Sequence, residues 1–600
     1  MLRDSRDSSR IRGRAAGGRA TPQPAAPGRP VLPDPFYYLN NFRTVLSSLE
    51  ARYWDLLSSE ERQFITGFAE LHRASCALLV RMIMRKGDCF RLSRLQYAEI
   101  GDSAAAAAAL VDVGWLDDEP VLDGEQLHRL LTKAEILSYL PRARHLSTLR
   151  KSELLEVLRA QSPESQTWRA WFPHSNDRVY RARVKPLAER FRLTFFGNFR
   201  QDWTEFVLKD LGINSFERIE VHSAPFSTRA QIDAFCELAQ CQRDLDDGAA
   251  PDRVHAAVPA PICDSDWLEE HRQRLLFQVA LAYERRDDHW SALAVLSGCR
   301  CRGARMRRVR LLERLREWRA ARELCLAARE QAESESERQQ MRRVLPRLNR
   351  KLGMPGEAMP ELPGVASFEI LLDTLPSDRS LEIHLRDQLA RQDAAHSTVH
   401  YVENRLIDSL FTLLCWKAIF APIPGAFFHD FQYGPADLES GAFYDRRRHQ
   451  FAECFAEFES TQYQETIRQR FQEKRGIQAP FVAWGLLNEK LLDLALLCFP
   501  AAHLRLWFEW MVRDLVENRS GFPDLVQFWP EERRYRMVEV KGPGDRLQDN
   551  QRRFLEFCIE HDMPVAVCRV RSAAEMPVSG DVAATKNGAG SGSLCLNPCR

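Results

Sequence analysis

Two carboxylates and a lysine near the C-terminal end of this sequence are spaced in a way that could support hydrolysis. Asp524 directly follows a Gly-Phe-Pro turn and opens an apolar segment that predicts a strand. After a charged turn, a second predicted strand over 534–541 carries Glu539 and Lys541. Side chains alternate across a strand, so Glu539 and Lys541 share one face, and a hairpin can bring Asp524 onto the same face.

Such a trio has the chemistry that cleavage of a phosphodiester requires. Two carboxylates offer hard oxygen ligands to Mg²⁺ or Mn²⁺ and leave coordination positions for water and phosphate. A bound ion lowers the pKa of its water from about 15.7 to about 7 and offsets charge that develops on phosphorus. The Lys541 ammonium can orient that water or stabilise the oxyanion. Pro523-Asp524 followed by Glu539-x-Lys541 matches the PD-(D/E)-x-K signature of metal-dependent nucleases.

A surface hairpin with an exposed Glu–Lys pair is the alternative interpretation. The apolar neighbours Val538 and Val540 favour an interior strand, in which an unpaired charge would be costly. Downstream, a helix is predicted over 552–561 and a strand over 564–570. The order of hairpin, helix and strand predicts an α/β domain around the trio.

Composition limits the class of protein without selecting a function. A chain of 600 residues is too long for one hydrophobic core, so we expect about three to five domains. Its 45% hydrophobic and 28% charged residues and its net charge of +1 are ordinary for a globular protein. Arginine is far more common than lysine, which suits phosphate binding but would also follow from a GC-rich genome. No apolar run is long enough for a membrane span, and the scattered cysteines predict reduced thiols in a cytoplasmic protein.

The N-terminal half predicts helical modules with basic turns. Apolar residues recur at helical spacing from Phe36, and the cations around Gly87 mark a turn. Farther on, two short helices around a basic turn look like a SAP-type DNA-binding pair, with Ser147 or Thr148 as a cap for the second helix. In that interpretation Lys133, Arg150 and Lys151 face DNA phosphates. An ordinary solvated helical hairpin is the alternative.

A short internal repeat predicts an array of paired helices. The pattern Trp290-x-Ala-Leu-x-x-Leu returns at Trp318 as Trp-x-Ala-Ala-x-x-Leu, and large residues alternating with small ones let neighbouring helices pack closely. This resembles a tetratricopeptide-like scaffold. Its arginines could contact a duplex or could simply be solvated; they are Arg302, Arg305, Arg307, Arg308 and Arg310.

The nuclease motifs resemble a known module and the whole chain resembles a known family. Gly-x-Pro-Asp-Leu, Val-Glu-Val-Lys-Gly-Pro-x-Asp-Arg-Leu and then Gln551 resemble the virus-type replication–repair nuclease module, VRR-NUC. Over roughly 36–570 the sequence is similar to the Fanconi-associated nucleases, which combine SAP-like, tetratricopeptide-like and nuclease domains. Further matches lie at Arg85-Lys86-Gly87, at Phe196-Gly197-Asn198 and from Phe427 to Leu438.

The resemblance implies a mainly helical, multi-domain chain with a C-terminal α/β nuclease domain of the restriction-endonuclease type. The expected organisation is a disordered tail over 1–34, a helical DNA-binding domain over 35–124, SAP-like helices over 125–165, a helical connecting region over 166–260, tetratricopeptide-like repeats over 261–353, a linker over 354–365, the VRR-NUC domain over 366–575 and a flexible tail over 576–600.

The resemblance also implies additional site residues. Glu403, expected on a helix pressed against the sheet, would be a third carboxylate ligand, and the Val540 carbonyl a further one. Arg546 and Gln551 would contact phosphate or metal-bound water. Pro435-Ala-Asp437 is a second Pro-Asp element, but no Glu-x-Lys strand follows it, so we interpret it as structural.

The predicted activity is a Mg²⁺- or Mn²⁺-dependent nuclease that cuts 5′ flaps and degrades DNA from a 5′ end, in crosslink repair. The implied partner is branched or flapped duplex DNA, with a homodimer on DNA and no membrane. No cysteine precedes Cys76, so the ubiquitin-binding zinc finger of eukaryotic relatives is expected to be absent, which favours a bacterial, nucleoid-associated protein rather than a nuclear one. A four-way-junction resolvase, a restriction-type endonuclease and a non-catalytic DNA-binding scaffold are the alternatives.

Overall fold

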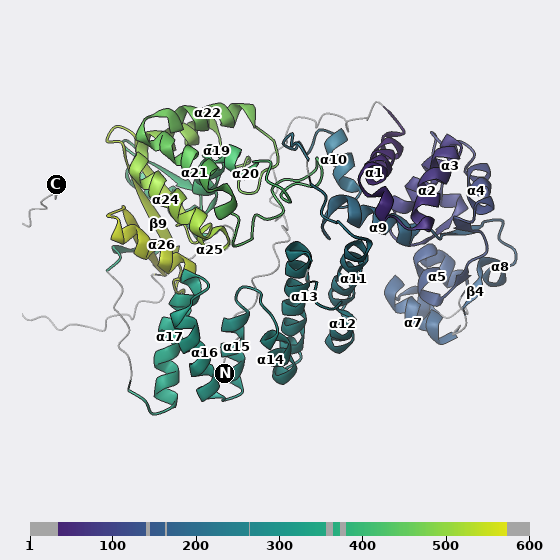
Figure 1. Cartoon of the computed structure of the whole chain (residues 1–600), viewed down its shortest axis with the longest axis horizontal. Coiled ribbons are helices and arrows are strands. Elements are labelled where there is room, and N and C mark those ends of the chain that lie inside the picture. The colour runs from purple at the N-terminus through teal and green to yellow at the C-terminus, as the bar shows by residue number, and fades with distance from the viewer. Residues whose placement is uncertain are drawn as a thin grey trace, which may run out of the picture. The chain divides into compact units, whose positions relative to one another are not determined.

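Figure 1 shows the computed structural model, which describes residues 34–139, 144–161, 165–221, 223–262, 264–355, 364–372 and 380–572. The predicted tails, almost all of 1–34 and all of 576–600, lie outside the described residues, as does most of the predicted linker. The chain divides into two compact units, and each is described by itself. The first comprises residues 1–47, 63–188 and 203–213, and the second 48–62, 189–202 and 214–600.

Short helices and a small antiparallel sheet form the N-terminal part of the chain. Up to residue 117 the elements are α1 (Tyr37–Tyr53), η1 (Trp54–Leu56), α2 (Ser59–Glu70), α3 (Arg73–Met84), β1 (Cys89–Arg91), η2 (Leu92–Arg94), α4 (Ser103–Asp112) and β2 (Leu116–Asp117). The predicted turn is present, because Gly87 has a φ of +82°. The prediction missed β1, which directly follows this turn and is too short to show a period of two. Phe42, Phe68 and Trp203 bring their rings together in the core.

The next module has its own small core. Its elements are β3 (Val121–Leu122), α5 (Gly124–Leu130), α6 (Lys133–Tyr139), η3 (Arg144–Ser147), α7 (Lys151–Gln161), β4 (Gln166–Thr167) and α8 (Trp168–Trp171). The strand that follows, β5 (Val179–Ala182), returns to the first sheet and pairs with β1 and β2. Leu127, Ile136, Leu154 and Trp168 are buried together. A 3-10 turn occupies 144–147, α7 begins at Lys151, and the Glu153 carboxylate accepts the backbone N–H of Arg150 just before it. The cap at Ser147 or Thr148 stays a prediction. The basic turn itself lies mostly outside the described residues.

A row of helices follows, each packed on its chain neighbour from α13 to α17 (Figure 1). The elements are α9 (Lys185–Phe196), α10 (Thr204–Asp210), α11 (Arg229–Asp246), α12 (Pro251–Ala257), α13 (Asp266–Arg285), α14 (His289–Ser297), α15 (Ala304–Arg314), α16 (Trp318–Glu330) and α17 (Glu335–Lys351). Trp290 and Trp318 occupy the first turn of α14 and α16, the second helix of two successive pairs. The repeat in the sequence therefore corresponds to a repeated helical hairpin.

The C-terminal part is a five-stranded mixed sheet covered by helices. Its strands are β6 (Ser367–Leu372), β7 (Thr398–Tyr401), β8 (Leu525–Trp529), β9 (Arg534–Lys541) and β10 (Val565–Ser572), in the order β6-β10-β9-β8-β7. β8 pairs antiparallel with β7 and β9, whereas β10 runs parallel to β9 and β6. The helices are α18 (Leu381–Gln392), α19 (Arg405–Leu414), α20 (Trp416–Ile419), η4 (Asp445–Arg447), α21 (Arg448–Ala456), η5 (Glu457–Glu459), α22 (Gln462–Glu473), α23 (Glu489–Cys498), α24 (Ala501–Arg513), α25 (Leu515–Asn518) and α26 (Asp549–Glu560).

β9 is the central strand, as the apolar residues in its sequence predicted. Val538 and Val540 pack in a core with Leu385 of α18, while Met537 faces the larger core on the opposite side. The predicted hairpin, helix and strand are confirmed in that order. No single helix among the described residues has the length and hydropathy of a membrane span; α23 and α24 reach it only when taken together across a bend of 105°.

Candidate active site

The register of the hairpin places Asp524 beside Glu539. Leu525 pairs with Val538, so the antiparallel ladder carries Asp524, one residue earlier, to the level of Glu539. The Val540 N–H donates a hydrogen bond of 2.9 Å to Asp524 Oδ2. Asp524 is therefore held by the backbone of the neighbouring strand, and the predicted convergence of the two carboxylates is present in the structure.

Glu539 and Lys541 form an ion pair inside the protein. Lys541 Nζ lies 2.8 Å from Glu539 Oε1, and the two residues are only 8% and 1% exposed, in that order. Glu539 Oε2 is buried and accepts no hydrogen bond from the described residues. A buried carboxylate oxygen without a donor is costly. The cost falls if a cation or a water binds there.

Burial also raises the pKa of both carboxyls. For Asp524 the pKa rises to about 6, mainly through burial, while the hydrogen bond from Val540 N–H lowers it. For Glu539 it rises to about 7, again mainly through burial and then through the charge of Asp524. Like charges held together out of water favour the protonated form unless a cation is present. Perturbed carboxyls of this kind are typical of functional sites.

Glu403 lies in a turn, not on the helix where the resemblance placed it. β7 ends at Tyr401 and α19 begins at Arg405, and between them Glu403 has a φ of +44°, in the left-handed region. The N–H groups of Val402 and Glu403 both donate to the Asp524 carbonyl oxygen, at 2.9 and 3.0 Å. These two bonds hold a backbone conformation that a glutamate disfavours. Tyr401 Oη donates to Glu403 Oε2 at 3.0 Å.

Asn404 ties the same turn to the Pro-Asp element. Its Oδ1 accepts hydrogen bonds from the N–H groups of Gly521 and Phe522 at 2.9 and 3.0 Å. Gly521 has a φ of +100°, and a Cβ there would lie 2.6 Å from the carbonyl carbon of Asn550. Only glycine fits this close approach to α26. Asn404 and Gly521 were not predicted; the Gly-x-Pro-Asp motif was the signal for the second.

Glu382 is a fourth acidic residue that the prediction missed. It lies in the first turn of α18, and its charge contributes to the raised pKa of Asp524. No local motif marks it, because only the packing of α18 on the sheet brings it near a residue so far along the chain.

The donor set fits a hard divalent cation, although the ligands are not assembled as a closed cage. The described residues contain no group of three or more histidine, cysteine, aspartate or glutamate side chains arranged to hold a metal ion. Lys541 pairs with Glu539, and the Tyr401 hydroxyl donates to Glu403. Carboxylate oxygens are nonetheless the ligands that Mg²⁺ and Mn²⁺ prefer, and Glu539 Oε2 still lacks a donor.

The residues predicted to bind DNA have unequal surroundings. Lys133 Nζ donates to the Ser147 carbonyl at 3.0 Å, and burial together with the charge of Arg94 lowers the pKa of Lys151. Arg150 and Arg546 are exposed. Gln551 caps α26, since its Oε1 accepts the Gln548 N–H at 2.9 Å. Its side chain is thus occupied by the helix start.

The arginines of the helical array are mostly paired with acids of their own unit. Arg302 binds Asp514, Arg305 binds Glu337 and Arg307 binds Glu284. The array therefore does not present these three as a free basic face, because intramolecular ion pairs already engage them. The second Pro-Asp element is structural as predicted: Asp437 pairs with Arg446 and with the fully buried Arg447.

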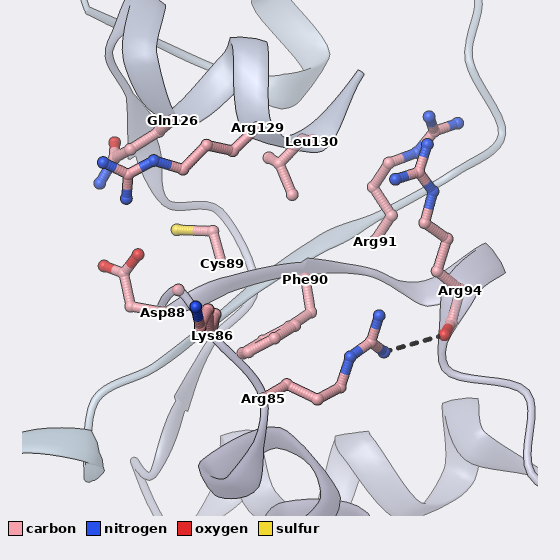
Figure 2. A pocket seen from close by; sticks show the side chains of 11 residues that line it. Arg85, Lys86, Asp88, Cys89, Phe90, Arg91, Arg94, Gln126, Arg129 and Leu130 are labelled. Atoms are coloured by element: carbon pink, nitrogen blue, oxygen red, sulfur yellow. Dashed lines mark hydrogen bonds between the residues drawn. The ribbon is translucent and has the colours of Figure 1, made fainter. Parts of the chain in front are cut away.

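A basic cavity of about 410 Å³ lies in the first unit (Figure 2). The segment 85–94 forms one wall, and Gln126, Arg129 and Leu130 of α5 form the other. The charged residues that line it are Arg85, Lys86, Asp88, Arg91, Arg94 and Arg129. Five cations face one carboxylate, so an anion is the ligand that the lining favours.

Comparison with known proteins gives the same class of protein as the fold and site. Three family models match: "VRR-NUC domain" over residues 459–572, "FAN1, HTH domain" over 36–117 and "Fanconi anemia-associated nuclease SAP domain" over 121–171. The C-terminal domain is thus a VRR-NUC nuclease domain, and the chain is a DNA nuclease of the PD-(D/E)-x-K type, which works with a divalent metal ion. Glu403 lies upstream of the residues that the VRR-NUC model matches.

Whole-chain relatives define the family. A Fanconi-associated nuclease 1 homolog of Pseudomonas aeruginosa is 48% identical over 90% of this chain and 97% of its own length. A homolog from Arabidopsis thaliana is 25% identical over 90% of this chain and 67% of its own length. A crystal structure of paFAN1 bound to 2-nt 5′ flap DNA with a gap matches with a TM-score of 0.86 and 48% identity, covering 90% of this chain and 99% of that chain. The chain belongs to the Fanconi-associated nuclease 1 family, as the sequence motifs predicted.

Proposed function

We propose that this chain is a structure-specific nuclease that cuts 5′ flap DNA and degrades DNA from a 5′ end in the repair of interstrand crosslinks. Family membership and the match to paFAN1 bound to 5′ flap DNA support the substrate class. The observation that carries the proposal is the buried carboxylate of Glu539 beside Asp524, at the end of the central hairpin. Its Oε2 accepts no hydrogen bond from the described residues. Action in the bacterial cytoplasm at the nucleoid, and as a homodimer on DNA, remain predictions.

In this proposal Glu403, Asp524 and Glu539 hold one or two Mg²⁺ or Mn²⁺ ions, with the Val540 carbonyl as a further ligand. A bound divalent ion supplies Lewis-acid stabilisation of phosphorane charge and a lowered pKa for water. The N–H groups of Val402 and Glu403 fix the Asp524 backbone, and the Val540 N–H fixes its carboxylate. The carboxylates are therefore pre-positioned, which reduces the reorganisation needed when substrate binds.

In this proposal Lys541 is a hydrogen-bond donor at the reacting centre. Its ammonium is buried within 2.8 Å of Glu539, so it can donate a hydrogen bond to a phosphate oxygen or to the attacking water. Low exposure strengthens such a contact because little water competes for it. The HTH- and SAP-type modules would bind the duplex, so that selectivity follows DNA shape and bendability at the junction rather than base sequence.

Cleavage of a labelled 5′ flap duplex by the full chain tests this function. Asp524→Asn and Glu539→Gln should reduce single-turnover cleavage by a factor on the order of a thousand or more, because several kcal/mol of charge stabilisation is lost. Glu531→Gln is the matched control, since Glu531 is an exposed carboxylate in the turn of the same hairpin. Activity that persists in both active-site variants would overturn the assignment.

Substrate preference is tested in the same assay. A 5′ flap should be cut faster than blunt duplex or a four-way junction by the wild-type chain with Mg²⁺ or Mn²⁺. Symmetric paired cuts in a four-way junction would instead indicate a resolvase, and sequence-dependent cuts in plain duplex a restriction-type endonuclease. DNA binding with no cleavage of any of these substrates would leave only a scaffold role.

A further inference from the structure

α25 leads directly into the Pro523-Asp524 element of the nuclease site. Only residues 519–523 separate the last residue of this helix from Asp524. A helix of four residues is too short to be stable by its own hydrogen bonds, so its place depends on contacts from other elements. Those contacts come from the helical array as well as from the nuclease domain.

The helical array contacts the start of α25. Asp514 caps this helix, since its Oδ1 accepts the Glu517 N–H at 3.2 Å. Arg302, just before α15, pairs with the same carboxylate through both of its terminal nitrogens. Arg302 lies outside the residues that the VRR-NUC model matches. The cap of α25 is therefore held by a residue from outside the nuclease domain.

A second contact joins α17, α25 and α26 through one guanidinium. Arg553 of α26 donates from Nη1 to Gln339 Oε1 of α17 at 3.0 Å, and from Nη2 to Glu517 Oε2 of α25 at 3.2 Å. Arg553 is 8% exposed, and its Nε is buried without a hydrogen-bond partner among the described residues. A buried cation with an unused donor is costly, and apolar side chains often stabilise such a position better. The arrangement therefore favours a role in fixing geometry over a role in stability.

The first turn of α26 contacts the same segment of the chain. Arg343 of α17 pairs with Asp549, and Asn550 Nδ2 donates to Ser520 Oγ at 3.1 Å. The Asn550 backbone also lies against Gly521, where it leaves no room for a Cβ. The array, α25 and α26 thus form one connected set of contacts around the residues that precede the catalytic aspartate.

We propose that Arg553 is a positioning residue through which the helical array holds the Pro523-Asp524 element in the geometry needed for cleavage. Arg553 acts through Glu517 and α25, not by touching the reacting groups. The proposal rests on the proposed function, since Asp524 is the group to be positioned. A displacement of about 1 Å in a catalytic group can cost about a hundredfold in rate. Loss of the array contact should therefore slow cleavage although no contact with DNA has changed.

Single-turnover cleavage of a labelled 5′ flap duplex by the full chain, at saturating enzyme, tests the proposal. Arg553→Ala should slow the chemical step about ten- to a hundredfold and leave DNA affinity, measured by anisotropy, within about twofold of wild type. Arg553→Lys keeps a cation that can pair with Glu517 and should recover part of the rate. The Mn²⁺ concentration that gives half of the maximal rate should rise in Arg553→Ala, because Asp524 is displaced.

A double-mutant cycle with Gln339 shows whether the array is the source of the effect. Gln339→Ala alone should slow cleavage about three- to tenfold, although Gln339 lies outside the nuclease domain. In the Arg553→Ala background the same change should have no further effect, because the contact that it removes is already lost. Losses that multiply in the double variant would contradict coupling through Arg553.

Arg470→Ala separates positioning from a general loss of stability. Arg470 is a buried arginine of the same domain, 7% exposed, and it donates to the carbonyl oxygens of Leu413 and Leu414 at the end of α19. Its loss should lower the melting temperature without changing the single-turnover rate or the Mn²⁺ dependence at temperatures where the chain stays folded. If Arg553→Ala does not fold, Arg553→Lys and the half-buried Gln339→Ala supply the test. The proposal is contradicted if Arg470→Ala slows cleavage as much as the Arg553 variants, or if the Arg553 and Gln339 variants cleave at the wild-type rate.

The outcome is separable from that of the proposed function. Cleavage that survives Asp524→Asn would overturn the nuclease-site assignment. Loss of cleavage in Asp524→Asn, together with wild-type rates in the Arg553 and Gln339 variants, would overturn only the positioning role.

Discussion

The carboxylates of the nuclease domain and the cations of the cavity are built for opposite kinds of contact. Glu539 is buried, it shares its surroundings with Asp524, and its Oε2 has no donor among the described residues. Arg85 and Lys86 are exposed on a turn and lack carboxylate partners in the described part of the chain. Burial of like charges is costly and is tolerated where one ion must be held in one place. Exposed cations cost little in folding free energy, and their attractions to an anion add together.

This difference predicts two patterns of response to mutation. Changes at the carboxylate site should act through geometry and protonation, and each should have a large effect because the members work as a unit. Changes at the cavity should be graded and sensitive to salt, because each cation contributes its own screened attraction. The following variants sharpen the contrast at the nuclease site, from the largest expected effect to the smallest.

Among these further variants, Lys541→Met should have the largest effect on the chemical step, close to that of the carboxylate variants. It removes a buried donor aimed at the reacting centre, which is worth about a hundred- to a thousandfold in rate. DNA affinity should remain near the wild-type value, since one buried ammonium contributes little to duplex binding. Rapid-quench single-turnover kinetics and anisotropy separate the two quantities. A rate within a few-fold of wild type would show that Lys541 only balances the charge of Glu539.

Asn404→Ala should lower cleavage by about ten- to a hundredfold without touching the reacting groups. The change leaves the N–H groups of Gly521 and Phe522 without their acceptor and loosens the turn that carries Asp524. Asn404→Asp keeps an acceptor oxygen and should recover most of the lost rate. Equal losses in the two variants would mean that the hydrogen bonds at Asn404 do not position the site.

Gly521→Ala should mainly reduce stability. Its backbone lies in the left-handed region, and the added Cβ would meet the backbone of Asn550, so we expect a loss of about 1–3 kcal/mol in the free energy of unfolding. Chemical denaturation of the wild-type chain, of Gly521→Ala and of the control variant Gly544→Ala measures this loss. Gly544 also has a positive φ, of +80°, but its Cβ would meet nothing within 4 Å. Equal losses would remove close packing as the cause.

Glu539→Gln should stabilise the metal-free protein at high pH and do little at low pH. Folding raises the pKa of this carboxyl from 4.5 to about 7, so the folded chain retains a proton that the unfolded chain releases. The free energy of unfolding of the wild type therefore falls as pH rises from about 4 to about 7 and then levels off. Each pKa unit is worth about 1.4 kcal/mol. In EDTA at about pH 8, Glu539→Gln should melt at a higher temperature than the wild type. Added Mn²⁺ should remove this difference in melting temperature. A difference that stays constant at all pH values would contradict the prediction.

The sequence predicted the chemistry better than it predicted the geometry around it. Asp524, Glu539 and Lys541 follow from a strand period of two and a short hairpin, both of which are local properties. The central position of β9 follows from its apolar residues. In contrast, the turn at Glu403 depends on hydrogen bonds to Asp524, more than a hundred residues away in the chain. The resemblance, which implied a helix there, therefore misplaced it.

The surface residues were the least predictable part. The arginines of the array look like a basic face in the sequence, yet acids from distant parts of the chain pair with Arg302, Arg305 and Arg307. Glu382 and the cavity at Gly87 were missed for the same reason, since each is formed only when separate elements pack together. Charge type can be taken from the sequence, but charge compensation cannot.

The most direct test of the account is a calorimetric titration of the full chain with Mn²⁺, at a pH above the raised pKa values of both carboxyls. We predict that Asp524→Asn and Glu539→Gln abolish binding, that Glu403→Gln weakens it, and that the exposed-hairpin control Glu531→Gln binds like wild type. Retention of wild-type affinity and stoichiometry in all three site variants would show that these carboxylates do not hold the metal ion.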